Sequence, residues 1–327
     1  MKLQRRQFLT AIAVGAGAWL PAVSRIATAQ VYPSKSARII VAFAAGGSTD
    51  IVARLLAQRL SERLGQQFII DNRPGAATNI ATEVVVRAPP DGYTLLMVDA
   101  SPTINATLYE KLNFNFIRDI APVACTIRAP LVMLVNPAVP AKTVPEILAY
   151  AKANPGRLNV GTGGIGSTSH MAGELLKMMT GIATTHVHYR GGGPALTDLL
   201  GGQVQVYFNG VAPSLEYIRT GQLRALAVTS ATRSEALPEI PTVSEFVPGY
   251  ELIQWYGVGV PKSTPSEIVD KLNNEINAAV SDPTMKARFA DWGGTAFAGS
   301  AAAFGRLIAD DTEKWGRVIR AASVNAE

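Results

Sequence analysis

The sequence predicts an α/β fold of two lobes, each a mostly parallel or mixed sheet flanked by helices. Short apolar strands alternate with helical patterns along the chain, which is typical of such sheets. The strands form two sets, and no Ser- or Pro-rich linker separates them. We therefore expect extended segments near residues 130–134 and 250–258 to connect the lobes, with a cleft at the carboxyl ends of the strands. Lobe 1 is expected to comprise residues 30–131 and 255–327, and lobe 2 residues 132–254.

The first 29 residues have the pattern of an export signal. Basic residues precede an apolar run at 11–20, and Ala27-Thr28-Ala29 is a small-x-small cleavage site. The run is too short and too rich in Ala and Gly to span a membrane. Arg5-Arg6-Gln7-Phe8-Leu9 matches the twin-arginine pattern, which favours that route over plain Sec export. We therefore expect a periplasmic protein.

The charge balance argues against a nucleic-acid partner. The 327 residues carry 30 Lys and Arg against 25 Asp and Glu, hence a charge of +5. Four of the basic residues and none of the acids precede residue 30, so the mature chain of 298 residues (327 − 29) carries only +1 (5 − 4). Nothing in that balance favours nucleic acid or an anionic membrane surface. The single cysteine, Cys125, excludes an intramolecular disulfide and is expected to be buried.

In the first lobe, apolar runs predict strands at residues 38–43, 68–70 and 94–98. A helix is expected after Gly46-Gly47-Ser48-Thr49-Asp50, because apolar residues then recur every four positions until Gly65. A second helix is predicted over residues 79–86, before a Pro-Pro-Asp-Gly turn.

In the second lobe, five strands are predicted, at residues 131–135, 158–160, 185–188, 204–208 and 225–229. Thr143-Val-Pro-Glu146 is a capping box that opens a helix. After Trp255, Thr264-Pro265-Ser266-Glu267 is interpreted as a second capping box, and a last helix is predicted around residues 304–319.

Three glycine-rich loops, each between a strand and a helix, form the candidate binding site. They lie at residues 46–50, 161–170 and 189–194. Each places backbone N–H groups and the positive end of a helix at the carboxyl end of a strand, which favours a small anion such as a carboxylate. Four residues add neutral hydroxyl donors: Ser48, Thr49, Ser167 and Thr168. The alternative, that the loops are only tight turns with Asp50 or Ser48 as an N-cap, stays open.

One loop also matches the dinucleotide-binding pattern. Gly161-x-Gly163-x-x-Gly166 follows a strand and precedes a helix, but the acid that should end the next strand is absent. That strand ends at Tyr189-Arg190. Because the Arg190 side chain is able to bind the 2′-phosphate of NADP, an exported NADP-dependent oxidoreductase stays open as an alternative. We expect no cofactor.

Reactive groups are not arranged for catalysis or metal binding. His186 and His188 share a strand face, and His170 and Glu174 a helix turn, but each pair lacks further ligands, so no metal site is expected. There is no Gly-x-Ser-x-Gly nucleophile elbow. The acids near strand ends form no acid–base pair: Asp50, Asp91, Asp99 and Asp198. The sequence therefore predicts a binding protein rather than an enzyme.

Short strings in a fixed order along the mature chain resemble substrate-binding proteins of the tripartite tricarboxylate transporter system, the Bug type of periplasmic solute receptor. The strings include Gly46-Gly47-Ser48-Thr49-Asp50, Asp71-Asn72-Arg73-Pro74-Gly75-Ala76, Pro89-Pro90-Asp91-Gly92-Tyr93, Gly166-Ser167-Thr168-Ser169-His170, Tyr189-Arg190-Gly191 and Trp255-Tyr256-Gly257. The resemblance implies a type II periplasmic-binding-protein fold whose chain crosses twice between its lobes. It also implies a monomeric receptor that closes on a mono-, di- or tricarboxylate, aromatic ones included, and delivers it to the permease subunits.

The resemblance also implies site residues. The implied ligand contacts are Gly47, Ser48, Thr49, Asp50, Ser167, Thr168 and His170, with Tyr189, Arg190 and Gly191 as neighbours. Asp50 is expected to orient its loop, since its charge would oppose an anion. Two departures stand out: Gly75-Ala76-Ala77-Thr78 replaces the usual Gly-Ala-Gly-Gly, and Asn209 replaces an acid. Asn209 is either a ligand contact or a turn residue. A sensor that binds the same solute for a membrane kinase would share this pattern.

Overall fold

The computed structural model describes residues 32–109, 111–322 and 324. The chain divides into two units, Met1–Tyr32 and Pro33–Glu327. The predicted export signal lies outside the described residues, so the signal and its route stay predictions. In the part of the chain that is described, no helix combines the length and the apolar character needed to cross a membrane.

Lobe 1 is built on a mixed sheet. β1 (Ala37–Val41) pairs in parallel with β2 (Phe68–Asn72) and β3 (Thr94–Asp99), and β9 (Ile253–Pro261) pairs antiparallel with β3. β3 is buried at every position, as expected of a strand covered on both faces. The carboxyl ends of β1, β2 and β3 therefore meet at one edge of this sheet.

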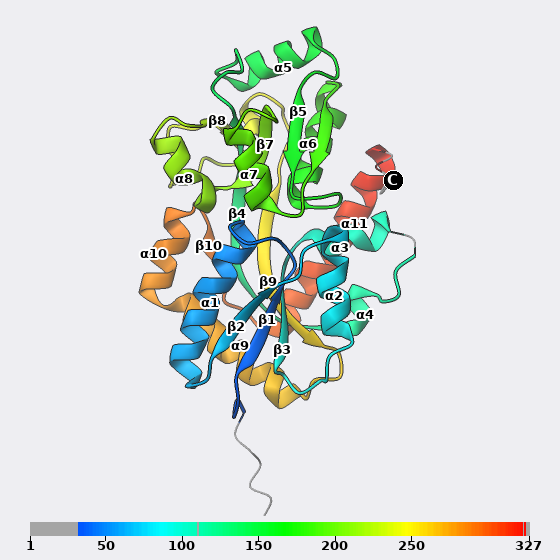
Figure 1. Ribbon diagram of the computed structural model, residues 1–327, viewed down its shortest axis with the longest axis vertical. Helices are drawn as coiled ribbons and strands as arrows, with labels where there is room; N and C mark the ends of the chain where they lie inside the picture. The colour runs from blue at the N-terminus through cyan, green and yellow to red at the C-terminus, as the bar shows by residue number, and fades with distance from the viewer. Residues whose placement is uncertain (1–31, 110, 323, 325–327) are drawn as a thin grey trace, which may run out of the picture. The chain divides into compact units, whose positions relative to one another are not determined.

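β4 (Ile120–Val135) runs through both lobes (Figure 1). Residues 120–130 pair with β9, and residues 131–135 pair with β7 (Val206–Gly210) and β8 (Arg224–Val228). The strand predicted at 131–135 is thus the end of a longer one, and Cys125 is buried within it as expected. The change of partners falls in the predicted crossing segment, while the lobe boundaries at 131 and 254 stay a prediction.

Lobe 2 completes the sheet. β5 (Asn159–Thr162) pairs in parallel with β6 (Thr185–His188) and β7, whereas β7 and β8 pair antiparallel with β4. The short β10 (Thr295–Ala296) also pairs with β4. The strand order is β2-β1-β3-β9-β4-β7-β5-β6, so the two-lobed α/β fold is confirmed with sheets that are mixed.

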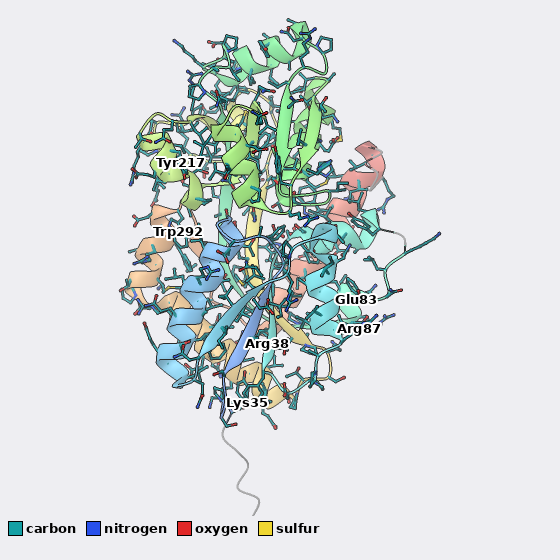
Figure 2. All side chains as sticks on the ribbon, viewed as in Figure 1. Lys35, Arg38, Glu83, Arg87, Tyr217 and Trp292 are labelled. Carbon is teal, nitrogen blue, oxygen red and sulfur yellow. The ribbon has the colours of Figure 1, made fainter. Side chains whose placement is uncertain are left out.

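The helices flank these sheets (Figure 1). In chain order they are α1 (Ser48–Leu64), α2 (Asn79–Val86), α3 (Ser101–Leu108), α4 (Phe116–Asp119), α5 (Val144–Ala153), α6 (Thr168–Thr180), α7 (Gly192–Leu200), α8 (Val211–Arg219), α9 (Ser266–Ser281), α10 (Pro283–Asp291) and α11 (Ala301–Ala322). Two 3₁₀ turns, η1 (Ala76–Thr78) and η2 (Val243–Glu245), complete the set in the described part. Glu83 of α2 and Arg87, just after that helix, form an ion pair on the outside of the molecule (Figure 2).

Helix starts agree with prediction at one capping box and differ at the other. Thr143 caps α5 by accepting a hydrogen bond from the Glu146 N–H at 3.3 Å. At α9 the prediction is wrong, because the N-cap is Pro265, which has no side-chain acceptor. The Thr264 hydroxyl is instead buried without a hydrogen-bond partner.

α11 packs against both lobes. Phe304 and Ile308 join the lobe 1 core, while Trp315 and Ile319 join the apolar cluster that surrounds Met171 of lobe 2. The helix therefore continues the connection that β4 makes through the sheet.

Candidate functional site

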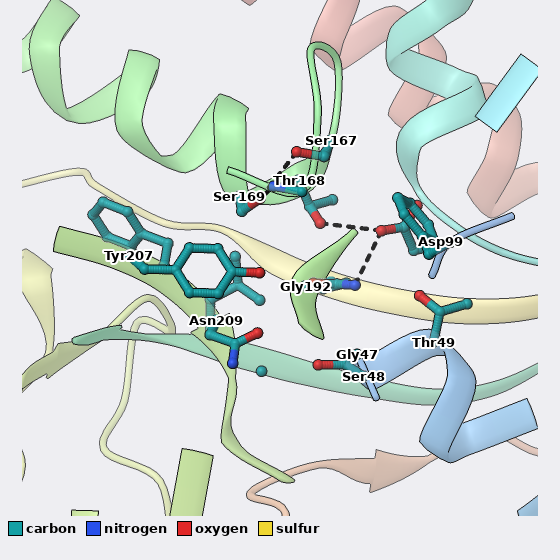
Figure 3. Close-up of a pocket in the computed structure, with 16 residues that line it drawn as sticks. Gly47, Ser48, Thr49, Asp99, Ser167, Thr168, Ser169, Gly192, Tyr207 and Asn209 are labelled. Atoms are coloured by element: carbon teal, nitrogen blue, oxygen red, sulfur yellow. Dashed lines mark hydrogen bonds between the residues drawn. The ribbon is translucent and has the colours of Figure 1, made fainter. Parts of the chain in front are cut away.

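A cavity of about 40 Å³ lies between loops of the two lobes, at the carboxyl ends of the strands. Six predicted residues line it: Gly47, Ser48, Thr49, Ser167, Thr168 and Asn209 (Figure 3). The other lining residues are Phe43, Asp99, Leu131, Gly163, Ser169, Gly192, Tyr207, Phe208, Gly210 and Gln254. Two of the three predicted glycine-rich loops thus line the cavity with several residues each, and the third lines it with Gly192.

Three helices begin at this cavity with a glycine as N-cap. They are α1 at Gly47, α7 at Gly191 and α8 at Gly210, and in none of them does a side chain cap the first turn. The interpretation of Asp50 or Ser48 as the N-cap of α1 is therefore wrong. The unpaired N–H groups and helix dipoles of three helices place positive potential around one small space.

α6 also begins at the cavity, but with a side-chain cap. The Ser167 hydroxyl accepts a hydrogen bond from the His170 N–H at 3.2 Å and donates one to the Gly164 carbonyl at 2.7 Å. Ser167 and Ser169 hydroxyls are 2.9 Å apart, and Ser169 accepts the Gly163 N–H. This serine pair fixes the shape of the lobe 2 wall.

The lobes meet backbone to backbone at their glycines. The Ala44 N–H of lobe 1 donates to the Arg190 carbonyl of lobe 2 at 3.1 Å. A Cβ atom added to Gly47 would lie 3.3 Å from the Gly192 nitrogen, and one added to Gly193 would lie 2.5 Å from the Ala45 carbonyl oxygen. Glycine is therefore required for this approach of the two loops.

Asp50 supports the lobe 1 loop from behind and does not line the cavity. One carboxylate oxygen accepts the Gly46 N–H at 3.0 Å and the Arg54 Nε at 2.9 Å, and the other accepts the Asn72 amide at 2.9 Å. Burial acts to raise the pKa of Asp50, but these hydrogen bonds and the Arg54 charge outweigh it and lower the pKa. The carboxylate thus stays ionised and holds the glycine loop in place.

The remaining predicted lobe 2 residues lie outside the cavity lining. The Tyr189 hydroxyl donates to Asp198 at 2.6 Å, and Arg190 contributes its carbonyl to the contact with Ala44. Gly191 has a φ of 144° at the start of α7, where a Cβ atom would lie 2.8 Å from the Ala44 nitrogen. These residues shape the loop that carries Gly192.

The histidines form one cluster that the sequence did not show. Ligand atoms of His170, Glu174 and His186 lie within 4.8 Å of one another, so the two pairs, each expected to lack further ligands, meet in one group. The His186 Nδ1 is 2.8 Å from a Glu174 carboxylate oxygen, and Lys177 contacts the same oxygen at 2.8 Å. His188 packs edge-on against His170, with ring centroids 4.9 Å apart.

The hydrogen bonds of this cluster compete with metal binding. The Gly166 N–H donates to the His170 Nδ1 at 3.1 Å, so the ring proton is on Nε2, the atom that faces Glu174. Burial, together with the neighbouring histidines, lowers the pKa of His170 to about 3. Burial acts to raise the pKa of Glu174, but the hydrogen bonds from His186 and Lys177 outweigh it and lower this pKa to about 2. Neutral His170 thus braces the first turn of α6 behind the cavity.

Asp99 and Gln254 are cavity residues that the sequence analysis did not assign. Asp99 ends β3 and is 3% exposed, and the Gln254 amide donates to its carboxylate at 3.1 Å. The Thr168 hydroxyl of lobe 2 donates to the same oxygen at 3.3 Å (Figure 3). The available indication was that Asp99 ends a strand, since strand ends border ligand sites in α/β sheets.

Comparison with known proteins places this chain in a family. Residues 52–324 match the family model described as "Tripartite tricarboxylate transporter family receptor". Protein BugT of Bordetella pertussis is 35% identical over 296 residues, which cover 90% of this chain and 91% of that protein. A protein of Agrobacterium vitis is 36% identical over 263 residues, 80% of this chain and 76% of that protein.

Solved structures share the fold over most of the chain. An R. palustris protein with adipate is 35% identical with a TM-score of 0.87, covering 90% of this chain and 99% of that one. The periplasmic binding protein BugD is 31% identical with a TM-score of 0.87, covering 90% and 99%. MatC from Rhodopseudomonas palustris with bound malate is 30% identical with a TM-score of 0.84, covering 88% and 100%.

Proposed function

The chain belongs to the tripartite tricarboxylate transporter receptor family, and from this membership we propose that it captures a small carboxylate between its lobes and delivers it to a membrane permease. The observation that carries the proposal is the convergence of three glycine-capped helix N-termini on one cavity. Such N-termini bind anions through their free N–H groups. The adipate and malate in similar structures support this ligand class.

In this proposal a ligand carboxylate accepts hydrogen bonds from first-turn N–H groups of both lobes. The Ser48 hydroxyl lines the same space and adds a donor. The Ser167 and Thr168 hydroxyls also line it, but their hydrogens go to the Gly164 carbonyl and to Asp99. Hydrogen bonds to a charged group contribute about 1.5–3 kcal/mol each, so a few of them give useful affinity to a small ligand. The protein acts by binding, without a chemical step.

Ligand entry and capture then depend on movement of the lobes. The cavity of about 40 Å³ is small for a dicarboxylate, so the loops at Gly47 and Gly192 separate to admit the ligand. The β4 segment where pairing passes from β9 to β7 and β8 serves as the hinge. We further propose that the receptor works as a monomer in the periplasm, exported by the twin-arginine route.

The test is a thermal-shift and calorimetric screen of the purified protein against C4–C6 dicarboxylates, citrate, benzoates and amino acids, with uncharged sugars and NADP as controls. A ligand at a hundred times its Kd should stabilise the protein by about 2.7 kcal/mol. Replacing Ser48 and Ser167 by Ala together removes one hydroxyl donor and the side-chain cap of α6, and should weaken binding by about 2 kcal/mol, roughly thirtyfold. Ser281→Ala, at the exposed end of α9, is the matched control.

The outcomes separate the alternatives. Stabilisation by NADP alone would favour an exported oxidoreductase. A double variant that binds a stabilising carboxylate as tightly as the wild type would contradict the site. Association with a kinase ectodomain rather than with permease subunits would favour a sensor.

A further inference from the structure

Asp99 is the one charged residue among the described residues that line the cavity. No Lys, Arg or His side chain lines the cavity with it. Asp99 is only 3% exposed and projects into the space toward Thr168 (Figure 3). A site for a simple carboxylate is expected to contain either a basic side chain or no charged side chain at all. The buried Asp99 carboxyl therefore needs an explanation.

Asp99 accepts three hydrogen bonds. One oxygen accepts the Ser101 N–H at 2.9 Å, and the other accepts the Thr168 hydroxyl at 3.3 Å and the Gln254 amide at 3.1 Å. The backbone N–H and the amide N–H can only donate, and the Thr168 hydroxyl donates here, so the three hydrogen bonds suit a carboxylate. Two further neighbours, Tyr207 and Tyr256, are neutral phenols.

None of these partners carries a positive charge. Burial raises the pKa of Asp99, because the neutral hydrogen bonds only partly replace the water that the carboxylate has lost. A ligand with only negative charges would add repulsion to this cost. A ligand with a cationic nitrogen would supply the missing partner.

Resting on the function proposed above, we propose that the ligand is an amino carboxylate whose ammonium group pairs with Asp99. Its carboxylate is held by the glycine-capped helix N-termini. Thr168 brings the Ser167-capped N-terminus of α6 beside this acid, since it is the first residue of α6 and its hydroxyl contacts Asp99. An α-amino acid matches this arrangement, because a single carbon separates its ammonium and carboxylate groups.

The experiment compares matched ligands that differ only in the amino group. Titration calorimetry of the purified protein would use aspartate against succinate, glutamate against glutarate, and 2-aminoadipate against adipate. We expect the amino member of at least one pair to bind ten times more tightly or better than its partner. In Asp99→Asn that preference should fall below threefold, through weaker binding of the amino member. Asp270→Asn, an exposed acid on α9, should keep the wild-type preference.

Each result has a separate meaning. If the amine-free member binds as tightly as, or more tightly than, the amino member in every pair that binds, the inference is wrong and the carboxylate receptor stands. If no member of any pair and no other carboxylate binds, the proposed function itself fails. If Asp99→Asn keeps the preference, the ammonium does not pair with Asp99. The wild-type comparison decides the ligand class even if the variant does not fold.

Discussion

Three consecutive residues without a glycine among them adopt positive φ angles before α2. Ala76, Ala77 and Thr78 have φ values of 43°, 50° and 77°. Asn105 of α3 holds this turn by donating to the Ala77 carbonyl and, at 3.3 Å, to the Thr78 hydroxyl. Left-handed backbone costs an L-residue about 1–2 kcal/mol, whereas glycine adopts it readily. The two glycines expected in this loop from the family resemblance would therefore fit its backbone better than Ala77 and Thr78.

Ala77→Gly should raise the free energy of unfolding. Relief of the left-handed strain exceeds the extra entropy that glycine loses on folding, leaving a gain of roughly 0.5–1 kcal/mol. Urea denaturation followed by circular dichroism measures the change. Ala278→Gly, in the last turn of α9, is the control and should lower stability by up to about 1 kcal/mol. A loss of stability in Ala77→Gly would show that the strain is not relieved there.

At the scale of elements, the sequence predicted those with a continuous apolar run or a clear helical period. It identified the strands at β1 and β3 and the helices α1 and α2 for that reason. It missed residues 120–130 of β4, where Pro122, Pro130 and exposed Arg128 interrupt the pattern.

Contacts between distant elements were beyond the sequence. Asp99 meets Thr168 and Gln254, which lie 69 and 155 positions further along the chain. The histidine cluster forms because α6 connects the parallel strands β5 and β6 and so packs beside the latter. Local spacing identified the glycine loops but not which residues would face each other across the cleft.

The packing of α6 against β6 makes stability depend on pH. The folded protein keeps His170 neutral because burial and the adjacent histidines lower its pKa to about 3. An unfolded chain takes up that proton near pH 6.5, so the free energy of unfolding falls as the pH drops below that value. From pH 7 to pH 5 the loss should be about 2 kcal/mol.

Urea denaturation across this range measures the loss. The chain has three histidines, all in this cluster, so no other histidine contributes. His170→Asn keeps an acceptor near the Gly166 N–H and should flatten the pH dependence. His188→Asn should flatten it less, because His188 is more exposed. An unchanged slope in His170→Asn would contradict the assignment.

For the whole molecule, the decisive feature is that the lobes touch through glycine backbone. β4 and α11 join the lobes on one side of the cavity, while the loops at Ala44 and Gly191 touch on the other. A ligand held by helix N-termini of both lobes stabilises this contact, so binding and closure are coupled. A substitution that blocks this contact without damaging either lobe therefore tests whether ligand binding requires closure of the lobes.

Gly193→Ala is such a change. Gly193 is the second residue of α7, where alanine is compatible with the helix, so the unliganded protein should stay folded with its lobes further apart. The new Cβ atom would lie 2.5 Å from the Ala45 carbonyl oxygen of lobe 1, which prevents the loops from approaching. Ligand affinity should fall at least tenfold, and small-angle scattering should show a larger radius of gyration with ligand present. Gly305→Ala in α11, where the added Cβ makes an ordinary 3.4 Å contact with Pro122, should bind normally. If Gly193→Ala also binds normally, the ligand does not require the lobes to meet at these glycines.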